Sequence, residues 1–146
     1  METLGQGART RPRPGTSQAE LSLTVPASAE ASGELRRALR SLDRWLGPQT
    51  AEDVDLLVTE LATNGVKHAR TVDGNRITLD AHVEPGLLRV EVRDGGHGFE
   101  HERRRADRTE PGGWGLMLVD GLADRWGIEG EPSTTVWFEI ASRAAA

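Results

Sequence analysis

Apolar and polar residues alternate along three stretches of the chain, which is the pattern of a β-strand with one buried face. The first of them, LSLTV, ends at Pro26. The other two flank the turn residues Glu84-Pro85-Gly86 and therefore predict a β-hairpin. A fourth stretch, TTVWFEI, is mostly apolar and predicts a buried strand. The expected strands are residues 21–25, 75–83, 87–94 and 134–140.

Apolar residues recur every three or four positions in three other stretches, which predicts helices that each bury one face. Gly47-Pro48 ends the first helix, and Ser28 is a candidate N-cap for that segment. Thr50 with Asp53 resembles a capping arrangement for the second helix. The third helix follows GGWG and includes Trp126 in its apolar set. The expected helices are residues 34–46, 51–69 and 116–126.

The order strand, helix, helix, hairpin, loop, helix, strand predicts an α+β fold. We expect a two-layer sandwich with helices on one face of a mostly antiparallel mixed sheet. The chain of 146 residues suits one core, and we expect a single domain over residues 19–142. Residues 1–18 have little to bury and predict a disordered tail. Residues 100–110 are mostly charged and predict a mobile loop or a short exposed helix.

Composition narrows the functional classes. The net charge of −5 does not favour binding to the phosphates of nucleic acid or to anionic lipid. The chain has no cysteine, which excludes disulfides, thiolate chemistry and cysteine-based zinc sites and fits a reducing cytosol. No apolar run approaches the roughly 20 residues that a membrane helix needs. We therefore expect a cytoplasmic protein without membrane or direct nucleic-acid contact.

One polar stripe lies on the expected helix 51–69, where Glu60, Asn64 and His68 follow each other four residues apart. A solvated flank accounts for such a stripe without any function. The functional alternative is that Asn64 offers an amide oxygen of the kind that Mg²⁺ accepts. Glu60, one turn earlier, is then placed to orient or deprotonate a hydroxyl. His68 either contacts a phosphate or is structural.

Two glycine clusters lie at the ends of expected elements. In DGGHG, the Asp94 carboxylate is suited to accept a hydrogen bond from an amine such as adenine N6, and the glycines let the backbone approach a flat ligand. A plain turn is the alternative. GGWG precedes a helix whose free N–H groups suit a phosphate, and a flexible junction is the alternative there. Neither cluster matches the P-loop or the dinucleotide fingerprint.

Together these pieces resemble the Bergerat ATP-binding fold, or histidine-kinase-like ATPase domain. Its members include gyrase, sensor histidine kinases, a heat-shock chaperone and the MutL proteins. The shared pattern is Glu-x-x-x-Asn on a helix, Asp-x-Gly-x-Gly after a strand, and a glycine loop entering a helix. ELATNGVKHA, VEVRDGGHGFE, GGWGLMLVDGLADRWG and TVWFEI are most similar to the small anti-sigma factor serine/threonine kinases of actinobacteria. The resemblance covers about residues 20–140.

The resemblance implies a role for each matching residue. Glu60 is the catalytic base, and Asn64 is the Mg²⁺ ligand beside the bound nucleotide. Asp94 is the carboxylate that recognises the adenine. The other implied ATP contacts are Gly96 and Gly98 beneath the base, Gly113, Gly115 and Leu116 on the phosphate side, and Thr135 as an assistant to Asp94; residues 99–111 match the ATP lid.

The implied activity is transfer of the ATP γ-phosphate, with Mg²⁺, to a serine or threonine of an anti-sigma-factor antagonist, which regulates a sigma factor. A homodimer is also implied. One alternative is a nucleotide-binding module that mainly sequesters a sigma factor, with little or no kinase activity. Another is a detached sensor-kinase ATPase domain, although no helical hairpin with a phospho-accepting histidine is evident.

Gly65 departs from the alanine usual in the family, which costs the helix about 1 kcal/mol unless close packing compensates.

Overall fold

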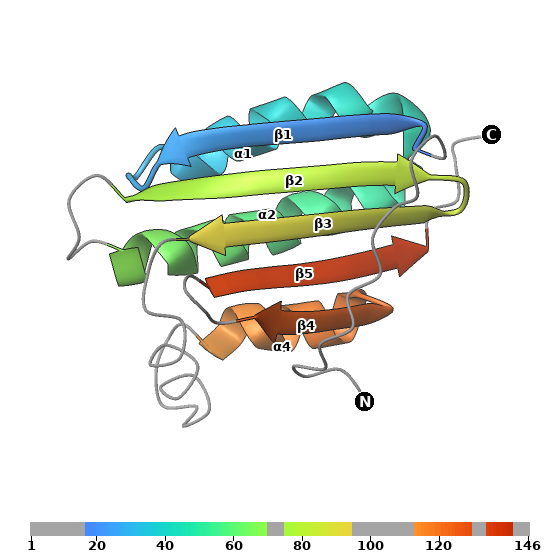
Figure 1. The fold of residues 1–146 in the computed structure, drawn as a ribbon. Helices are drawn as coiled ribbons and strands as arrows, with labels where there is room; N and C mark the ends of the chain where they lie inside the picture. Colours follow the sequence, from blue (N-terminus) through green and yellow to red (C-terminus); the bar gives the residue numbers. More distant parts are fainter. Residues whose placement is uncertain (1–16, 70–74, 95–112, 130–133, 142–146) are drawn as a thin grey trace.

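The sheet is the centre of the molecule. The computed structural model describes residues 17–69, 75–94, 113–129 and 134–141. In these residues, five strands form one sheet in the order β1-β2-β3-β5-β4, and each neighbouring pair is antiparallel (Figure 1). The strands are β1 (Ala19–Pro26), β2 (Arg76–Glu84), β3 (Leu87–Asp94), β4 (Arg125–Glu129) and β5 (Thr134–Ala141).

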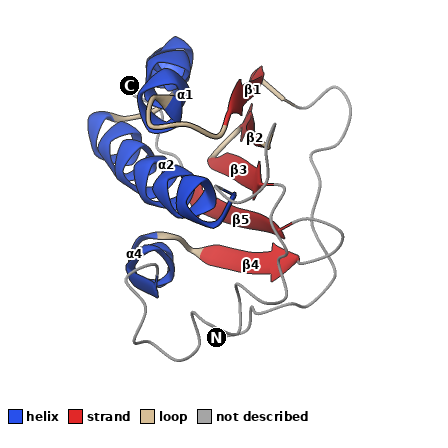
Figure 2. Cartoon of the chain, turned by 90° about the vertical axis from the view of Figure 1, so that its left-hand side faces the viewer, coloured by secondary structure: helices blue, strands red, loops and turns tan. Residues whose placement is uncertain are grey.

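The helices lie on one face of this sheet (Figure 2). They are α1 (Ala31–Leu39), the 3₁₀ helix η1 (Arg40–Trp45), α2 (Pro48–Ala69) and α4 (Gly113–Leu122). The architecture is therefore the predicted α+β sandwich of two layers. No described helix is long and apolar enough to cross a membrane.

The core lies between the two layers because each element buries the face that its sequence period predicts. Alternate residues of β2 are buried, and they are Ile77, Leu79, Ala81 and Val83. On α2 the buried apolar residues follow the helical spacing, and they are Val54, Leu57, Val58, Leu61 and Ala62. Full burial of each large aliphatic side chain contributes about 1.5–3 kcal/mol to folding.

The predicted hairpin is confirmed. Glu84 pairs with Leu87, so Pro85 and Gly86 form the turn between β2 and β3. Gly86 has a φ of 79°, a value that glycine adopts without steric penalty. Proline followed by a residue with positive φ is the signature of a type II turn. The sequence therefore fixes the register of the two strands locally.

The first expected helix is divided in the structure. α1 begins at Ala31, before the predicted start at residue 34, and η1 takes over from Arg40 to Trp45. Ser28 is not the N-cap of α1, because Glu30 occupies that position and makes no side-chain capping bond. Instead, Ser28 Oγ accepts a hydrogen bond from the N–H of Glu30 at 3.3 Å.

The second expected helix is longer than predicted. α2 begins at Pro48 rather than at residue 51. Proline suits the first helical position, because the N–H that it lacks has no partner there in any helix. Thr50 and Asp53 therefore lie inside the first turns of α2 and do not open it, and Gln49 Nε2 donates to Asp53 Oδ1 at 2.9 Å.

The predicted helix 116–126 is a shorter helix followed by a strand. α4 ends at Leu122, and Arg125–Glu129 forms the edge strand β4 beside β5. Trp126 lies four residues after Leu122, so it fits the helical period as well as the strand period. In the structure Trp126 is buried opposite Phe138, and its Nε1 donates to Asp120 Oδ1 of α4 at 3.0 Å.

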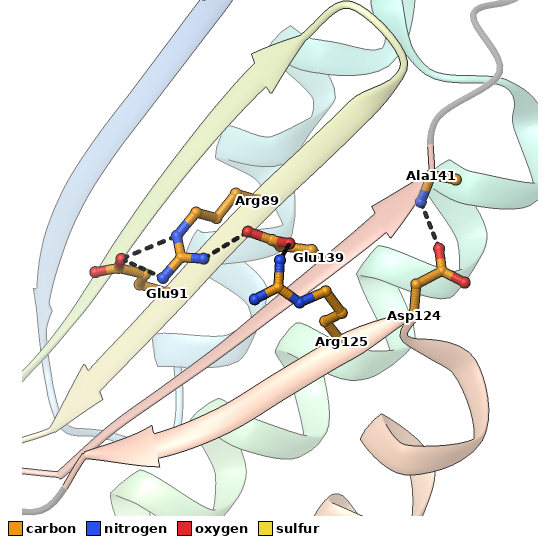
Figure 3. Close-up of polar contacts among 6 residues, drawn as sticks. All are labelled: Arg89, Glu91, Asp124, Arg125, Glu139 and Ala141. Carbon is orange, nitrogen blue, oxygen red and sulfur yellow. Dashed lines mark hydrogen bonds and ion pairs between the residues drawn. The ribbon is translucent and has the colours of Figure 1, made fainter. Parts of the chain in front are cut away.

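The sheet face away from the helices carries a cluster of buried charges that the sequence analysis missed (Figure 3). Arg89 of β3 donates through Nη1 to Glu139 Oε2 of β5 at 2.7 Å, and its guanidinium lies 4.4 Å from the Trp137 ring centroid. Arg125 of β4 donates to Glu139 Oε1 at 3.2 Å. Glu139 therefore links the three neighbouring strands β3, β5 and β4.

The first strand begins earlier than predicted. The N–H of Gln18 donates to the carbonyl oxygen of Val83 at 2.6 Å, so pairing with β2 begins before the expected strand 21–25. Residues 1–16, most of the expected tail, lie outside the described residues, as does the charged segment 100–110.

Candidate functional site

Asp94, the start of β5 and the C-terminal half of α2 lie at one end of the two layers. β3 ends at Asp94, and β5 begins at Thr134, its direct partner in the antiparallel register. α2 reaches this end with its C-terminal half, because a Cβ built on Gly65 would lie 3.3 Å from the Cβ of Asp94. α4 begins at the same end of the sheet (Figure 1).

Asp94 occupies a position where the strand pattern calls for an apolar residue. It shares the helix-facing side of β3 with Val90 and Val92, and it is only 8% exposed. Burial of a carboxylate is costly unless the charge is paired or hydrogen-bonded. The position therefore calls for a polar partner, and a carboxylate there also suits a polar group of a ligand.

Asn64 is buried on α2, next to Gly65, with 5% of its surface exposed. The solvated-flank interpretation of the polar stripe therefore does not hold for Asn64. Glu60, one turn earlier, is partly exposed. His68 also lies on α2, but its side chain is outside the description. An amide and a carboxylate one helical turn apart suit the roles of metal ligand and neighbouring base.

The two threonines that begin β5 point to opposite faces of the sheet. Thr135 pairs with Arg93 and not with Asp94, so its side chain lies on the helix-free face. Thr134 pairs with Asp94 and shares the helix-facing side with it. Thr134 is 1% exposed, and its Oγ1 has no hydrogen-bond partner among the described residues. The register thus places Thr134, in the position expected for Thr135, beside Asp94.

Sequence reasoning missed Thr134, although the sequence contains the signal for it. Val136, Phe138 and Ile140 are the apolar residues that β5 turns toward the helices. Counting back by two from Val136 reaches Thr134, since side chains alternate along a strand. A buried hydroxyl without a partner is unusual, and it marks a place where a ligand can bind.

The glycine clusters are described only in part. Gly96 and Gly98, with the expected lid 99–111, lie outside the described residues. Gly113 is the first residue of α4, and Gly115 and Leu116 follow in the first turn, where the backbone alone is described. The predicted helix is present, but it begins at Gly113, so Gly113 and Gly115 belong to its first turn and do not precede it. The first N–H groups of a helix have no intrahelical partner, and a helix start of this kind suits an anion.

The donor set fits a magnesium nucleotide. Among the described residues, no three histidine, aspartate or glutamate side chains gather into a metal-binding cluster. Mg²⁺ needs few protein ligands, because it keeps waters and substrate phosphates, and the amide oxygen of Asn64 is of the hard type that it accepts. The buried acceptor of Asp94 and the hydroxyl of Thr134 suit a base with an exocyclic amine.

Comparisons with known proteins agree with this geometry. Residues 25–140 match the family model of the histidine kinase-like ATPase domain. A serine-protein kinase RsbW of Staphylococcus aureus is 28% identical over 131 residues, which cover 80% of this chain and 82% of that protein. A serine-protein kinase RsbW of Listeria innocua is 30% identical over 119 residues, which cover 72% and 76% of the two chains. The actinobacterial likeness stays a prediction.

Proposed function

Because the chain belongs to the histidine kinase-like ATPase family, we propose that it binds ATP where Asp94, Thr134 and Asn64 meet and transfers the γ-phosphate to a protein serine or threonine. The observation that carries the proposal is the buried carboxylate of Asp94, which ends an apolar strand directly beneath α2. The names of the RsbW relatives support the choice of a serine kinase.

The adenine side of the site consists of Asp94 and Thr134. An ionised carboxylate only accepts hydrogen bonds, so Asp94 accepts one from the adenine N6 amine. The Thr134 hydroxyl, buried on the same side of the sheet, supplies a second polar contact. Gly96 and Gly98 remain expected contacts beneath the base.

The phosphate side consists of the start of α4 and the polar residues of α2. The free N–H groups around Gly113 and Gly115 bind the phosphates, since a helix N-terminus favours anions. Asn64 holds Mg²⁺, which neutralises charge on the transferred group when it is bound.

Glu60 is the general base of the transfer. Its carboxylate takes the proton from the hydroxyl of the acceptor residue, and the hydroxyl oxygen bonds to the γ-phosphorus. The bond between that phosphorus and the β–γ bridging oxygen breaks, and ADP leaves. The partly exposed position of Glu60 supports this role, because an acceptor protein has to reach it.

The acceptor is a small anti-sigma-factor antagonist protein, and its phosphorylation regulates a sigma factor. We further propose a homodimer. β1 supports it, because among the described residues this edge strand pairs only with β2 and leaves its other backbone edge for a partner. No feature of the described part of the chain favours sequestration without transfer.

Calorimetric titration of ATP, with Mg²⁺ or with EDTA, tests the proposal. We expect saturable, Mg²⁺-dependent binding to the wild type and its loss in Asp94→Asn, because the new amide offers N–H donors where an acceptor is needed. Asp80→Asn is the matched control, since Asp80 lies on β2 and bonds to Ser22 Oγ at 2.6 Å on the helix-free face. A folded wild-type protein that does not bind ATP would contradict the proposal.

A further inference from the structure

The centre of the helix-free sheet face is buried, although no described helix or strand lies over it (Figure 2). One row of side chains crosses the five strands on this face, and it consists of Glu20, His82, Arg89, Glu139 and Arg125. At the ends of the row, the side chains of Glu20 and Arg125 are 62% and 50% exposed. In the centre, those of Arg89 and Glu139 are 2% and 3% exposed. Neighbouring strands shield a side chain only from the sides, because side chains stand on a sheet, so the centre requires a cover from above.

Trp137, next to this row, leads to the same conclusion. Gly127 is its direct partner on β4, and a Cβ built there would lie 2.8 Å from Trp137 Nε1 and 3.0 Å from two of its ring carbons. The indole ring therefore leans over β4, along the surface of the sheet. The guanidinium of Arg89 lies 4.4 Å from the ring centroid. A ring that lies along an uncovered sheet is in contact with water, yet Trp137 is only 7% exposed.

Residues 1–16 are the part of the chain best placed to supply this cover. They lead into Gln18, whose N–H donates to the carbonyl oxygen of Val83 near the end of β2. Extended residues span about 3.3 Å each and strands lie about 4.8 Å apart, so the stretch 9–14 reaches β3, β5 and β4 from there. The other segments outside the described residues are less suitable, because 142–146 is short, 130–133 is held between β4 and β5, and 70–74 and 95–112 join the sheet to the helix layer.

The composition of residues 1–16 also suits this face. The segment METLGQGARTRPRPGT has three arginines against one glutamate and is therefore cationic. Opposite charge attracts it to the helix-free face, which carries more carboxylates than arginines. Pro12 and Pro14 stiffen the segment, and Pro-rich segments bind aromatic surfaces such as Trp137, because they have little backbone freedom to lose. The carboxylates of the face are Glu20, Asp80, Glu84, Glu91, Glu129 and Glu139.

We propose that residues 1–16 of this chain dock across the helix-free face, with the stretch 9–14 over Trp137 and the Arg89–Glu139 pair, and that the carboxylates of the face hold them there. The composition predicts no fold for this segment by itself, and the face supplies the ring and the charges that it lacks. The docked segment keeps water away from the buried ion pair. It also occupies the centre of the face, so a second copy of the chain cannot pack there, and β1 remains the edge for the proposed homodimer.

Paramagnetic broadening of amide signals in the full-length chain tests the proposal. The chain has no cysteine, so a nitroxide label on Thr10→Cys reports on one site alone. We expect the label to broaden the amide signals of Trp137 and Gly127 more than that of Gln18, because a free segment broadens the signals nearest its attachment most. Reduction of the nitroxide should restore all three. A label on Arg37→Cys, an exposed residue of α1, is the control and should broaden the amides of α1 most.

Charge reversal in the segment is the second part of the experiment. Arg9→Glu/Arg11→Glu/Arg13→Glu in the labelled Thr10→Cys chain should abolish the excess broadening at Trp137, because the segment then repels the carboxylates of the face. Arg37→Glu in the same labelled chain reverses an exposed charge on α1 and should leave the broadening at Trp137 unchanged.

Three results overturn the proposal. In the first, the broadening decreases steadily from Gln18, which makes residues 1–16 a free tail. In the second, the charge-reversed chain broadens Trp137 as strongly as its parent, so the carboxylates do not hold the segment. In the third, spin-labelled chains without ¹⁵N broaden Trp137 in unlabelled ¹⁵N chains mixed with them, which assigns the face to a second copy. None of these signals needs a nucleotide, so the result is independent of the proposed kinase activity.

Discussion

At the scale of single residues, the two threonines that begin β5 make a natural pair for a test. Thr134→Val should weaken ATP binding about three- to tenfold, because it removes the hydroxyl beside Asp94. It should not lower the free energy of unfolding, because the buried Oγ1 has no described hydrogen-bond partner to lose. Thr135→Val is the control and should leave ATP affinity unchanged. Calorimetry and urea unfolding measure the two effects, and a larger binding loss in Thr135→Val would reverse the assignment.

Glu60 is tested by separating binding from transfer. Glu60→Gln should keep ATP affinity and slow transfer to the antagonist protein by about 10²–10⁴-fold, which is the usual contribution of a general base. Labelled γ-phosphate on the acceptor gives the rate. Glu52→Gln changes an exposed residue two turns earlier on α2 and should transfer at the wild-type rate. If Glu60→Gln also kept that rate, another group would be the base.

At the scale of elements, the charge cluster on the helix-free face holds β3, β5 and β4 together. Arg89 and Glu139 are 1% and 2% exposed, so Glu139→Ala removes the shorter ion pair of a buried guanidinium and leaves it the contact with Glu91 at 3.3 Å. Glu139→Ala should lower the free energy of unfolding by about 3–5 kcal/mol, and the apolar pair Arg89→Met/Glu139→Leu should recover most of that loss. Chemical denaturation of both variants measures the free energy of unfolding.

The ion pair between Arg40 and Asp55 is the control for that prediction. Its atoms lie 3.1 Å apart, against 2.7 Å in the buried pair, but its side chains are 58% and 33% exposed. Asp55→Ala should therefore cost less than about 1 kcal/mol. Equal losses in Asp55→Ala and Glu139→Ala would show that burial does not govern the strength of these pairs.

At the scale of the whole molecule, the sequence predicted the two layers and the end of the sheet at which Asp94 lies, because both depend on local signals. Alternation identified the strands, Pro85-Gly86 identified the hairpin, and the position of Asp94 after an apolar strand identified one end of the sheet. Each of these signals lies within a few residues of the feature that it predicts. The family model, which matches residues 25–140, agrees with this part.

The features that the sequence did not predict depend on contacts between segments that are distant along the chain. Trp126 satisfies the helical and the strand period alike, and only pairing with β5 selects the strand. The choice between Thr134 and Thr135 required the register of β5 against β3. The sequence shows Gly65 only as a residue that destabilises α2, and only the fold brings Ile77 and Asp94 close to its backbone. The buried Arg89–Glu139 pair likewise joins two strands far apart in sequence.

The strand order also determines when the site can exist during synthesis. β5 is the last described strand along the chain, yet it lies between β3 and β4 in the sheet. A nascent chain on the ribosome that has released α2, the hairpin and α4 still lacks the strand on which β4 pairs and the residue opposite Asp94. Closure of the sheet thus depends on long-range contacts, which form slowly. The proposed adenine side of the site is completed in the same step that completes the fold.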